Sequence, residues 1–212
     1  MDVLLNIVHK DPDFVVVDKP SGLLSVPGKG PENADCVSSR VRRLFPECME
    51  HPSVHRLDMD TSGLIVMALN AGAQRGLSIQ FQNREIRKRY VALLEGEVSE
   101  SKGKIELAFR VDVNDRPRQI YDEVNGKLGI THWQKVGVED GKTRISMIPI
   151  TGRTHQLRVH AAHERGLGVP IVGDPLYGNG TGPAQLKLHA CELGFQHPVT
   201  GDALHFESAP AF

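Results

Sequence analysis

The sequence predicts an α+β fold with a mainly antiparallel or mixed central sheet, flanked by helices and loops. Short apolar runs alternate with polar residues and end at turn residues, which is typical of strands in such a sheet. A few helical patterns are mixed among these runs. With 212 residues, 40% of them hydrophobic, the chain can bury a real core, and we expect a single domain, or one domain with two lobes, over residues 1–212.

The first half of the chain shows its elements clearly. Asp11-Pro12-Asp13 predicts a turn between two strands. Residues 35–44 predict a short helix that ends before a proline, with Arg40, Arg42 and Arg43 on its exposed side. Residues 63–69 predict a buried strand, and Asn70 is placed to cap a helix that runs to about residue 83.

The second half is expected to contain five more strands and one helix. The strands are predicted at residues 88–96, 129–138, 144–150, 188–196 and 204–207. Thr154 is expected to cap a helix that ends near residue 164. Two long stretches, residues 97–127 and 166–183, are predicted to be irregular, and loops of that length tend to be functional or mobile.

Charge and cysteine content limit the class of protein. The formal net charge of −1 argues against a protein that coats nucleic acid through bulk charge. Three widely spaced cysteines fit neither a disulfide framework nor a zinc ribbon, so we expect reduced thiols. The start of the chain lacks the pattern of a signal peptide, and the longest apolar stretch is far too short to cross a bilayer. A cytoplasmic location, without membrane association, is therefore expected.

The densest polar motif is the segment 55–63, HRLDMDTSG, which leads directly into the strand at 63–69. One interpretation is a polar turn whose Asp and Thr side chains bind free backbone groups. Another is a Mg²⁺-dependent phosphotransferase that uses Asp58 and Asp60, since D-x-D-x-T opens the site of aspartate-nucleophile enzymes. In those enzymes the motif follows a strand, whereas here it precedes one.

A second cluster, TGRTHQLRVH at 151–160, follows a predicted strand and enters a helix. His160 and His163 lie three residues apart, a spacing that could suit a metal. No cysteine or acidic third ligand lies nearby at a regular spacing, so hydrogen-bonded helix histidines are the better interpretation. Arg153 and Arg158 are suited to serve as fixed cations beside a carboxylate or phosphate.

The clearest basic patch comprises Arg84, Arg87, Lys88 and Arg89, and Tyr90 follows it. Cations at a helix end favour the helix dipole, so a solvated terminus is one interpretation. Cations beside an aromatic residue are also the composition of a groove that binds nucleic acid, where phosphates are neutralised and a base stacks.

Taken in order, these motifs resemble the RluA-type pseudouridine synthases over nearly the whole chain, most closely the short members without an added RNA-binding domain. Two strings carry most of the specificity, H-R-L-D-x-x-T-S-G at 55–63 and G-R-x-H-Q-L-R-x-H at 152–160. Further matches are DFVVVDKPSGLL at 13–24, KRYVA at 88–92, PIVGD at 170–174, YG at 177–178, LHA at 188–190 and AP at 209–210. One departure is Val169, where the family commonly has histidine.

The resemblance implies roles for individual residues. Asp58 matches the catalytic aspartate, Tyr90 the tyrosine that packs on the target base, and Arg158 the arginine paired with the aspartate. Arg56 matches an arginine that helps to displace the target nucleotide from its stack. On composition alone Asp60 rivals Asp58, and only the family pattern selects Asp58. The RNA-binding set expected from the motifs comprises His55, Arg56, Arg84, Arg87, Lys88, Arg89 and Arg153.

The implied activity is isomerisation of specific uridines to pseudouridine in structured RNA, either ribosomal RNA, transfer RNA or both, within a catalytic cleft. Neither a metal nor an organic cofactor is expected, and a monomer is the default state. The alternatives are the Mg²⁺-dependent phosphotransferase and a non-catalytic RNA-binding protein, which would bind RNA equally well after loss of Asp58.

Overall fold

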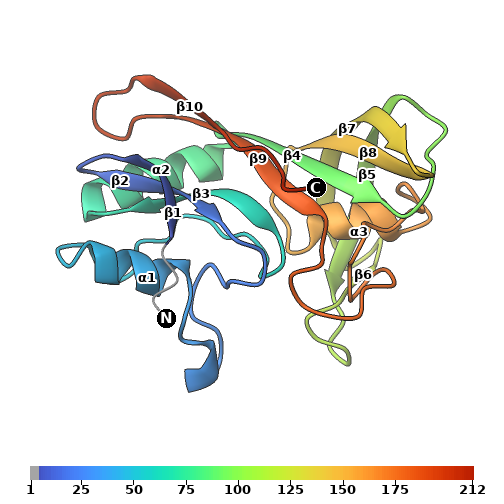
Figure 1. Ribbon diagram of the computed structural model, residues 1–212, viewed down its shortest axis with the longest axis horizontal. Coiled ribbons are helices and arrows are strands. Elements are labelled where there is room, and N and C mark those ends of the chain that lie inside the picture. The colour runs from blue at the N-terminus through green and yellow to red at the C-terminus, as the bar shows by residue number, and fades with distance from the viewer. Residues whose placement is uncertain (1–4) are drawn as a thin grey trace. The chain divides into compact units, whose positions relative to one another are not determined.

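The computed structural model describes residues 5–212 and confirms an α+β fold (Figure 1). The chain divides into two compact units. Unit 1 consists of the residues up to Lys88 together with Ala190–Ala211, and unit 2 consists of Arg89–His189 with Phe212. No helix within residues 5–212 is long and apolar enough to cross a membrane. A single catalytic domain over residues 1–212 remains a prediction.

The described residues of unit 1 form five strands and two α-helices. The strands are β1 (Asn6–Lys10), β2 (Phe14–Lys19), β3 (Ser62–Ala68), most of β9 (Leu188–Gln196) and β10 (Ala203–Glu207). Their order is β1-β2-β3-β9, with β10 paired to β9. The predicted turn at residues 11–13 is confirmed, because β1 and β2 pair antiparallel across it. The strands predicted at 63–69, 188–196 and 204–207 are confirmed as well.

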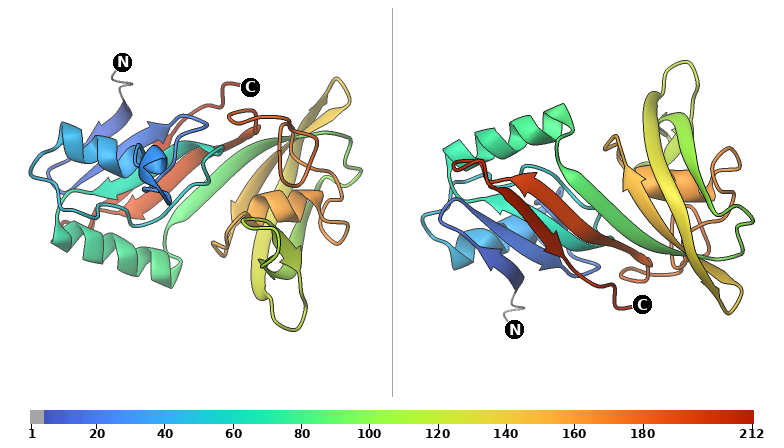
Figure 2. Two further views of the ribbon diagram at one scale, coloured as in Figure 1. Left: turned by 90° about the horizontal axis from the view of Figure 1, so that it is seen from below. Right: turned by 90° about the horizontal axis from the view of Figure 1, so that it is seen from above.

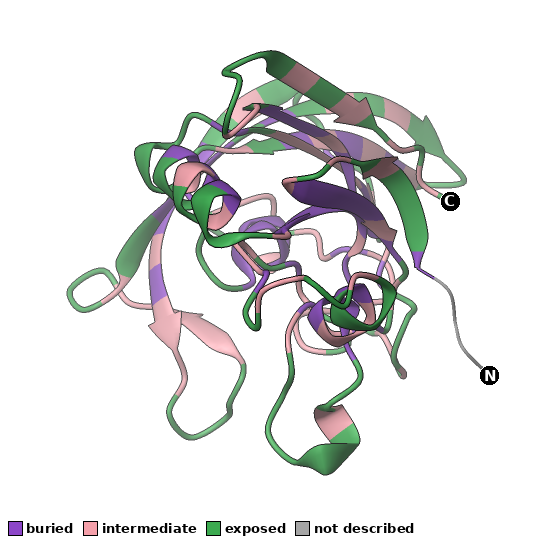
Figure 3. Cartoon of the chain, turned by 90° about the vertical axis from the view of Figure 1, so that its left-hand side faces the viewer, coloured by how far each residue is buried: buried purple, intermediate pink, exposed green. Residues whose placement is uncertain are grey.

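Both faces of the central strands of unit 1 are buried. Phe14 and Val16 of β2 pack with Leu64 and Val66 of β3 in one apolar cluster. Helix α2 (Ala71–Asn83) covers this face, and Asn70 caps it as predicted, since its Oδ1 accepts a hydrogen bond of 2.9 Å from the Ala73 N–H. The intervening residues of both strands are also fully buried. Figure 3 shows that exposed residues concentrate on the connections between elements.

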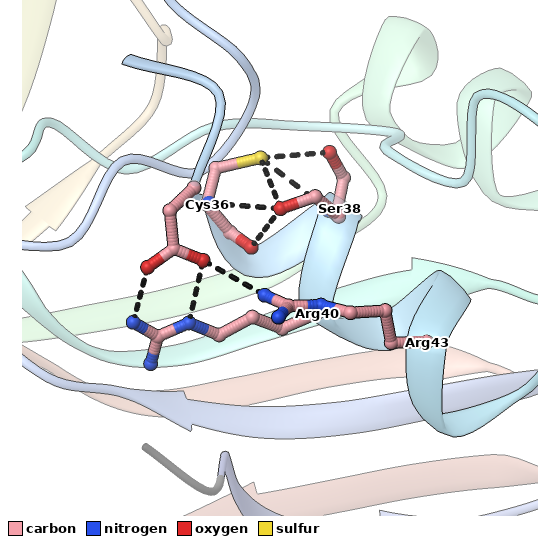
Figure 4. A network of polar contacts seen from close by, with 6 residues as sticks. Cys36, Ser38, Arg40 and Arg43 are labelled. Carbon is pink, nitrogen blue, oxygen red and sulfur yellow. Dashed lines mark hydrogen bonds and ion pairs between the residues drawn. The ribbon is translucent and has the colours of Figure 1, made fainter. Parts of the chain in front are cut away.

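Helix α1 (Val37–Leu44) begins with an unusual cap (Figure 4). The Cys36 thiol accepts a hydrogen bond from the Ser39 N–H, and the Ser39 hydroxyl accepts one from the Cys36 N–H. The helix is confirmed, although it begins at Val37, after its cap residue Cys36, rather than at Asp35. The Asp35 carboxylate instead binds two of the arginines predicted to lie on an exposed face, at 2.5 Å from Arg40 and 3.0 Å from Arg43. The Arg40 side chain is only 13% exposed, which corrects that expectation for this residue.

Unit 2 contains a sheet with the order β4-β8-β7-β5-β6, and every pair in it is antiparallel. Its strands are β4 (Arg87–Leu94), which starts in unit 1, β5 (Lys102–Val111), β6 (Gln119–Tyr121), β7 (Lys127–Glu139) and β8 (Lys142–Pro149). The strands predicted at 88–96, 129–138 and 144–150 are thus confirmed. The prediction that residues 97–127 are irregular is wrong, because this stretch contains β5 and β6. The irregular stretch predicted at 166–183 has no helix or strand.

The core of unit 2 lies between this sheet and helix α3 (Gln156–Ala162), which Figure 2 shows against the strands. The helix is shorter than predicted, and its cap residue is His155, at a left-handed φ of 56°, rather than Thr154. The physical reason for this difference is the set of hydrogen bonds that the Gln156 side chain makes. Its Oε1 accepts hydrogen bonds from the Arg153 N–H and the Thr151 hydroxyl, while its Nε2 donates to the Ile130 carbonyl.

His160 of α3 is buried in this core, against the ring of Phe109. Neither ring nitrogen has a hydrogen-bond partner among the described residues. Burial lowers the pKa of His160 to about 4. The folded protein therefore disfavours the proton that an unfolded chain takes up near pH 6.5.

This burial predicts that acid destabilises the protein. Because the folded pKa lies below the unfolded pKa, the free energy of unfolding should fall as the pH falls from about 6.5 to 4, by on the order of 3 kcal/mol from this group. The measurement is urea unfolding at a series of pH values. His160→Leu should flatten the slope in that window, and an unchanged slope would contradict the assignment.

Candidate functional site

The segment 55–63 forms a structured loop that leads into β3, all within unit 1. The Thr61 N–H donates to the Asp58 carbonyl at 3.1 Å, which closes a turn around Asp58-Met59-Asp60. Gly63 closes the segment at a φ of 107°, where a Cβ atom would lie 2.3 Å from the Ala190 carbonyl oxygen. Only glycine fits there. The Asp58 side chain is half-buried and that of Asp60 is buried, so Asp58 is the more accessible carboxylate.

Lys19, which the sequence motifs did not predict as a site residue, holds this loop in place. Its ammonium is fully buried and donates to the carbonyls of Pro20 at 3.0 Å, Leu23 at 2.7 Å and Met59 at 2.7 Å. Burial lowers the pKa of Lys19 to about 7, while the charges of Asp60 and Asp58 oppose that shift. The three carbonyls match the three N–H bonds of the charged form. A lysine inside the apolar run FVVVDKP was the available sequence signal.

Two serines secure the same loop. The Ser21 hydroxyl donates to the Asp60 carbonyl at 2.6 Å, and the Ser25 hydroxyl donates to the Leu57 carbonyl at 2.7 Å. The Leu57 N–H donates back to the Ser25 oxygen at 3.0 Å. The segment that follows β2 therefore holds the backbone on both sides of Asp58. The loop geometry depends on long-range contacts that neither segment could form alone.

His55 lies inside the framework of this loop. Its Nε2 accepts a hydrogen bond of 3.1 Å from the Val66 N–H of β3, and its ring stacks on Phe81 of α2 at 4.4 Å between centroids. Burial, together with the nearby charge of Lys88, lowers the pKa of His55 to about 3. A neutral ring that accepts from the backbone is suited to holding the loop. We therefore do not propose His55 as an RNA-binding residue.

The predicted basic residues differ in accessibility. Arg56, Arg84 and Arg87 of unit 1 are exposed, and Arg84 ends α2 in the left-handed conformation at a φ of 62°. Lys88 is partly buried, which lowers its pKa. In unit 2, Arg89 is partly buried, and Arg153 is exposed with its Nε donating to the Leu128 carbonyl at 3.2 Å.

Tyr90 and Arg158 belong to unit 2. Tyr90 lies on β4 and packs at the margin of the apolar core. Arg158 is only 4% exposed, and its Nε and Nη2 donate to the two carboxylate oxygens of Asp174 at 2.8 and 2.7 Å. The pairing of Arg158 with Asp174 was not predicted from the sequence. A pairing of Arg158 with Asp58, which the resemblance implies, remains a prediction because these residues belong to different units.

Two groups of side chains within residues 5–212 could hold a metal ion, and neither contains a predicted site residue. They are Asp11, Asp13 and His197, and Glu192, His205 and Glu207. In the first group the His197 Nδ1 accepts hydrogen bonds from the Val199 and Thr200 N–H groups. The proton therefore lies on Nε2, which faces Asp11 at 3.3 Å as a donor rather than as a ligand. Neither group supports the phosphotransferase interpretation of Asp58 and Asp60.

Comparisons with known proteins identify the class. The family model for RNA pseudouridylate synthase matches residues 13–163. Two solved human structures, RNA pseudouridylate synthase domain containing 1 and domain containing 4, have the same fold, with TM-scores of 0.79 and 0.77. The first is 30% identical, and the alignment covers 99% of this chain and 84% of that one. The second is 24% identical, over 97% of this chain and 88% of that one.

Curated relatives agree over almost the full length. Dual-specificity RNA pseudouridine synthase RluA of Yersinia pestis is 43% identical, over 97% of this chain and 99% of the relative. The Pasteurella multocida protein of the same name is 44% identical, over 100% and 95%. The chain belongs to the RNA pseudouridylate synthase family. It is accordingly an isomerase that acts on RNA, and the phosphotransferase alternative is wrong.

Proposed function

We propose that Asp58 is the catalytic residue of this pseudouridine synthase and that Tyr90 and Arg158 complete the site. The observation that supports Asp58 most directly is its place in a half-buried turn held by the buried Lys19. The reaction breaks the bond from N1 of uracil to C1′ and joins C5 to C1′. The C5 proton leaves for solvent and N1 gains a proton, so that no oxidant or reductant is consumed.

An ionised carboxylate is suited to this chemistry. It can meet the positive charge that develops at C1′ as the glycosidic bond breaks, or it can remove a proton from the sugar. The negative charge of Asp58 acts on the buried Lys19 ammonium and opposes the lowering of the Lys19 pKa. Tyr90 would supply a stacking face for the extruded base, worth about 1–3 kcal/mol, and its hydroxyl would assist removal of the C5 proton. Arg158 would act as a fixed cation.

The proposed substrates are loop uridines in more than one structured RNA, in the cytoplasm. The relatives carry the description "dual-specificity", which supports more than one RNA target. The test is tritium release from RNA labelled at uracil C5, combined with pseudouridine mapping in ribosomal and transfer RNA from cells with and without the gene. Wild-type protein that binds RNA but releases no tritium would instead favour the non-catalytic RNA-binding alternative.

The proposed mechanism needs no metal ion, so full activity is expected in excess EDTA. The measurement is the initial rate of tritium release from a short hairpin RNA that folds without Mg²⁺. Using such a hairpin separates a requirement of the enzyme from a requirement of RNA folding. A rate that falls on chelation and returns on addition of Mg²⁺ would contradict the proposal.

The exposed arginines of unit 1 are expected to contact phosphates. The double substitution Arg84→Ala/Arg87→Ala should reduce the salt dependence of RNA binding, lowering the slope of log K against log [salt] by about 0.7–0.9 for each lost phosphate contact. Fluorescence anisotropy at several salt concentrations measures this slope. Lys29→Ala, at an exposed loop position, is the control, and an equal effect there would indicate nonspecific electrostatics.

A further inference from the structure

Tyr177 is the centre of an interaction network in unit 2 that the proposed mechanism does not use. Its ring lies against the Arg158 guanidinium, with 5.2 Å from Cζ to the ring centroid. The Arg118 guanidinium also lies over this ring, at 5.7 Å. A guanidinium on an aromatic face is stabilised by the ring quadrupole, most strongly where it is shielded from water. Arg158 is shielded in this way, because it is almost fully buried.

The Tyr177 hydroxyl fixes the ring in place. It accepts a hydrogen bond of 2.8 Å from the Gln119 N–H at the start of β6, and it lies 2.8 Å from Nδ1 of His155, the cap residue of α3. The Arg118 side chain reaches the carbonyl of Leu176, the residue before Tyr177. These bonds connect the turn before β6 to the start of the helix that carries Arg158.

Asp174 holds the other side of the same arginine. Its carboxylate takes two hydrogen bonds from Arg158 and two more from the N–H groups of Leu176 and Tyr177, at 2.9 and 3.0 Å. These donors, together with the charge of Arg158, lower the pKa of Asp174, although burial opposes the shift. The two hydrogen bonds to Asp174 set the direction of the Arg158 guanidinium. Contact with the Tyr177 ring restricts the rotation of that guanidinium. The Nη1 nitrogen, which Asp174 does not engage, is thereby given a defined direction.

We propose that Tyr177 is a positioning residue for Arg158. It acts through the contact of its ring with the guanidinium and through the hydrogen bonds of its hydroxyl with β6 and His155. The proposal rests on the proposed function, because it assigns Tyr177 an effect on activity only through Arg158. A misplacement of about 1 Å can cost on the order of 10²-fold in rate, so a loosened guanidinium should slow the chemical step.

The first test is single-turnover kinetics with enzyme in excess over C5-tritiated RNA. The plateau rate reports steps after binding and is insensitive to a partly inactive preparation. Tyr177→Leu should lower the plateau rate about 10- to 30-fold, whereas Tyr177→Phe, which keeps the ring, should lower it less than about 5-fold. Tyr121→Leu is the matched control, because Tyr121 packs at the same core and also lies beneath an arginine, Arg165. An unchanged plateau rate in Tyr177→Leu would overturn the proposal.

A double-mutant cycle tests whether Tyr177 acts through Arg158. Arg158→Lys removes the planar guanidinium on which Tyr177 is proposed to act. Adding Tyr177→Leu in that background should therefore lower the plateau rate by less than about 3-fold. Multiplicative losses would show that Tyr177 acts independently of Arg158 and would overturn the proposal.

A measurement without activity separates this proposal from the proposed function. Hydrogen exchange of the Arg158 Nε–H, followed by NMR, should accelerate at least about 10-fold in Tyr177→Leu and stay unchanged in Tyr121→Leu. If the wild-type protein forms no pseudouridine but the exchange behaves as expected, the proposed function fails and the positioning role stands. Unchanged exchange in Tyr177→Leu overturns the positioning role, whatever the activity.

Discussion

Asp58→Asn is expected to abolish tritium release, with a loss of at least about 10³-fold in kcat, while the protein stays folded. The substitution keeps the shape of the side chain and removes the negative charge that the reaction requires. The hydrogen bonds to the backbone of the turn, from the Thr61 N–H to the Asp58 carbonyl and from the Lys19 ammonium to the Met59 carbonyl, do not involve the substituted group. The measurement is single-turnover tritium release, with thermal unfolding as the check on folding.

Asp60→Asn is the matched comparison, because Asp60 lies two residues away and is buried. We expect it to lower stability more than Asp58→Asn does and to retain measurable activity. Activity that survives in Asp58→Asn and disappears in folded Asp60→Asn would reverse the assignment of the two carboxylates. RNA binding in Asp58→Asn should remain close to that of the wild-type protein.

Lys19→Met is expected to cost about 3 kcal/mol in the free energy of unfolding and to lower activity. The substitution leaves the carbonyls of Pro20, Leu23 and Met59 without their shared donor and removes the cation near Asp58. Urea unfolding measures the first effect, and the plateau rate of tritium release measures the second. Both should change together, because one side chain holds the loop and supplies the charge.

The control for Lys19→Met is Lys29→Met, at an exposed position ten residues further along the chain. It should change the free energy of unfolding by less than about 0.5 kcal/mol. A Lys19→Met protein as stable as the wild type would mean that the three carbonyls find other partners.

Most strands were predictable from the sequence, but β5 was not. In β5, Ile105, Leu107 and Phe109 point into the core while Lys104 and Glu106 face solvent. This alternation is itself a strand pattern, but the charge of the segment concealed it. The cap of α3 was missed for a different reason, because the Gln156 amide depends on residues of β7 that only folding brings close.

The candidate site, too, was only partly predictable from the sequence. The motifs at 55–63 and 152–160 contain Asp58 and Arg158, but residue types alone left Asp58 and Asp60 as rivals, and only the family pattern selected Asp58. The support for each residue comes from distant segments, Lys19 for the first and Asp174 for the second. A buried lysine and a buried carboxylate become visible as partners only when the chain is folded, since sequence spacing gives no direction to a side chain.

The division of the chain has a consequence for biosynthesis. Unit 2 is one continuous segment apart from Phe212, whereas unit 1 is interrupted by it. The apolar cluster of unit 1 needs Leu193 and Phe195 of β9, which the ribosome delivers only after the whole of 89–189. Domains emerge and fold in the order of synthesis. Unit 2 can therefore form its core before the last strands of unit 1 have been synthesised. The loop around Asp58 therefore reaches its final surroundings only after residues 89–189 and the strands that follow them have been synthesised.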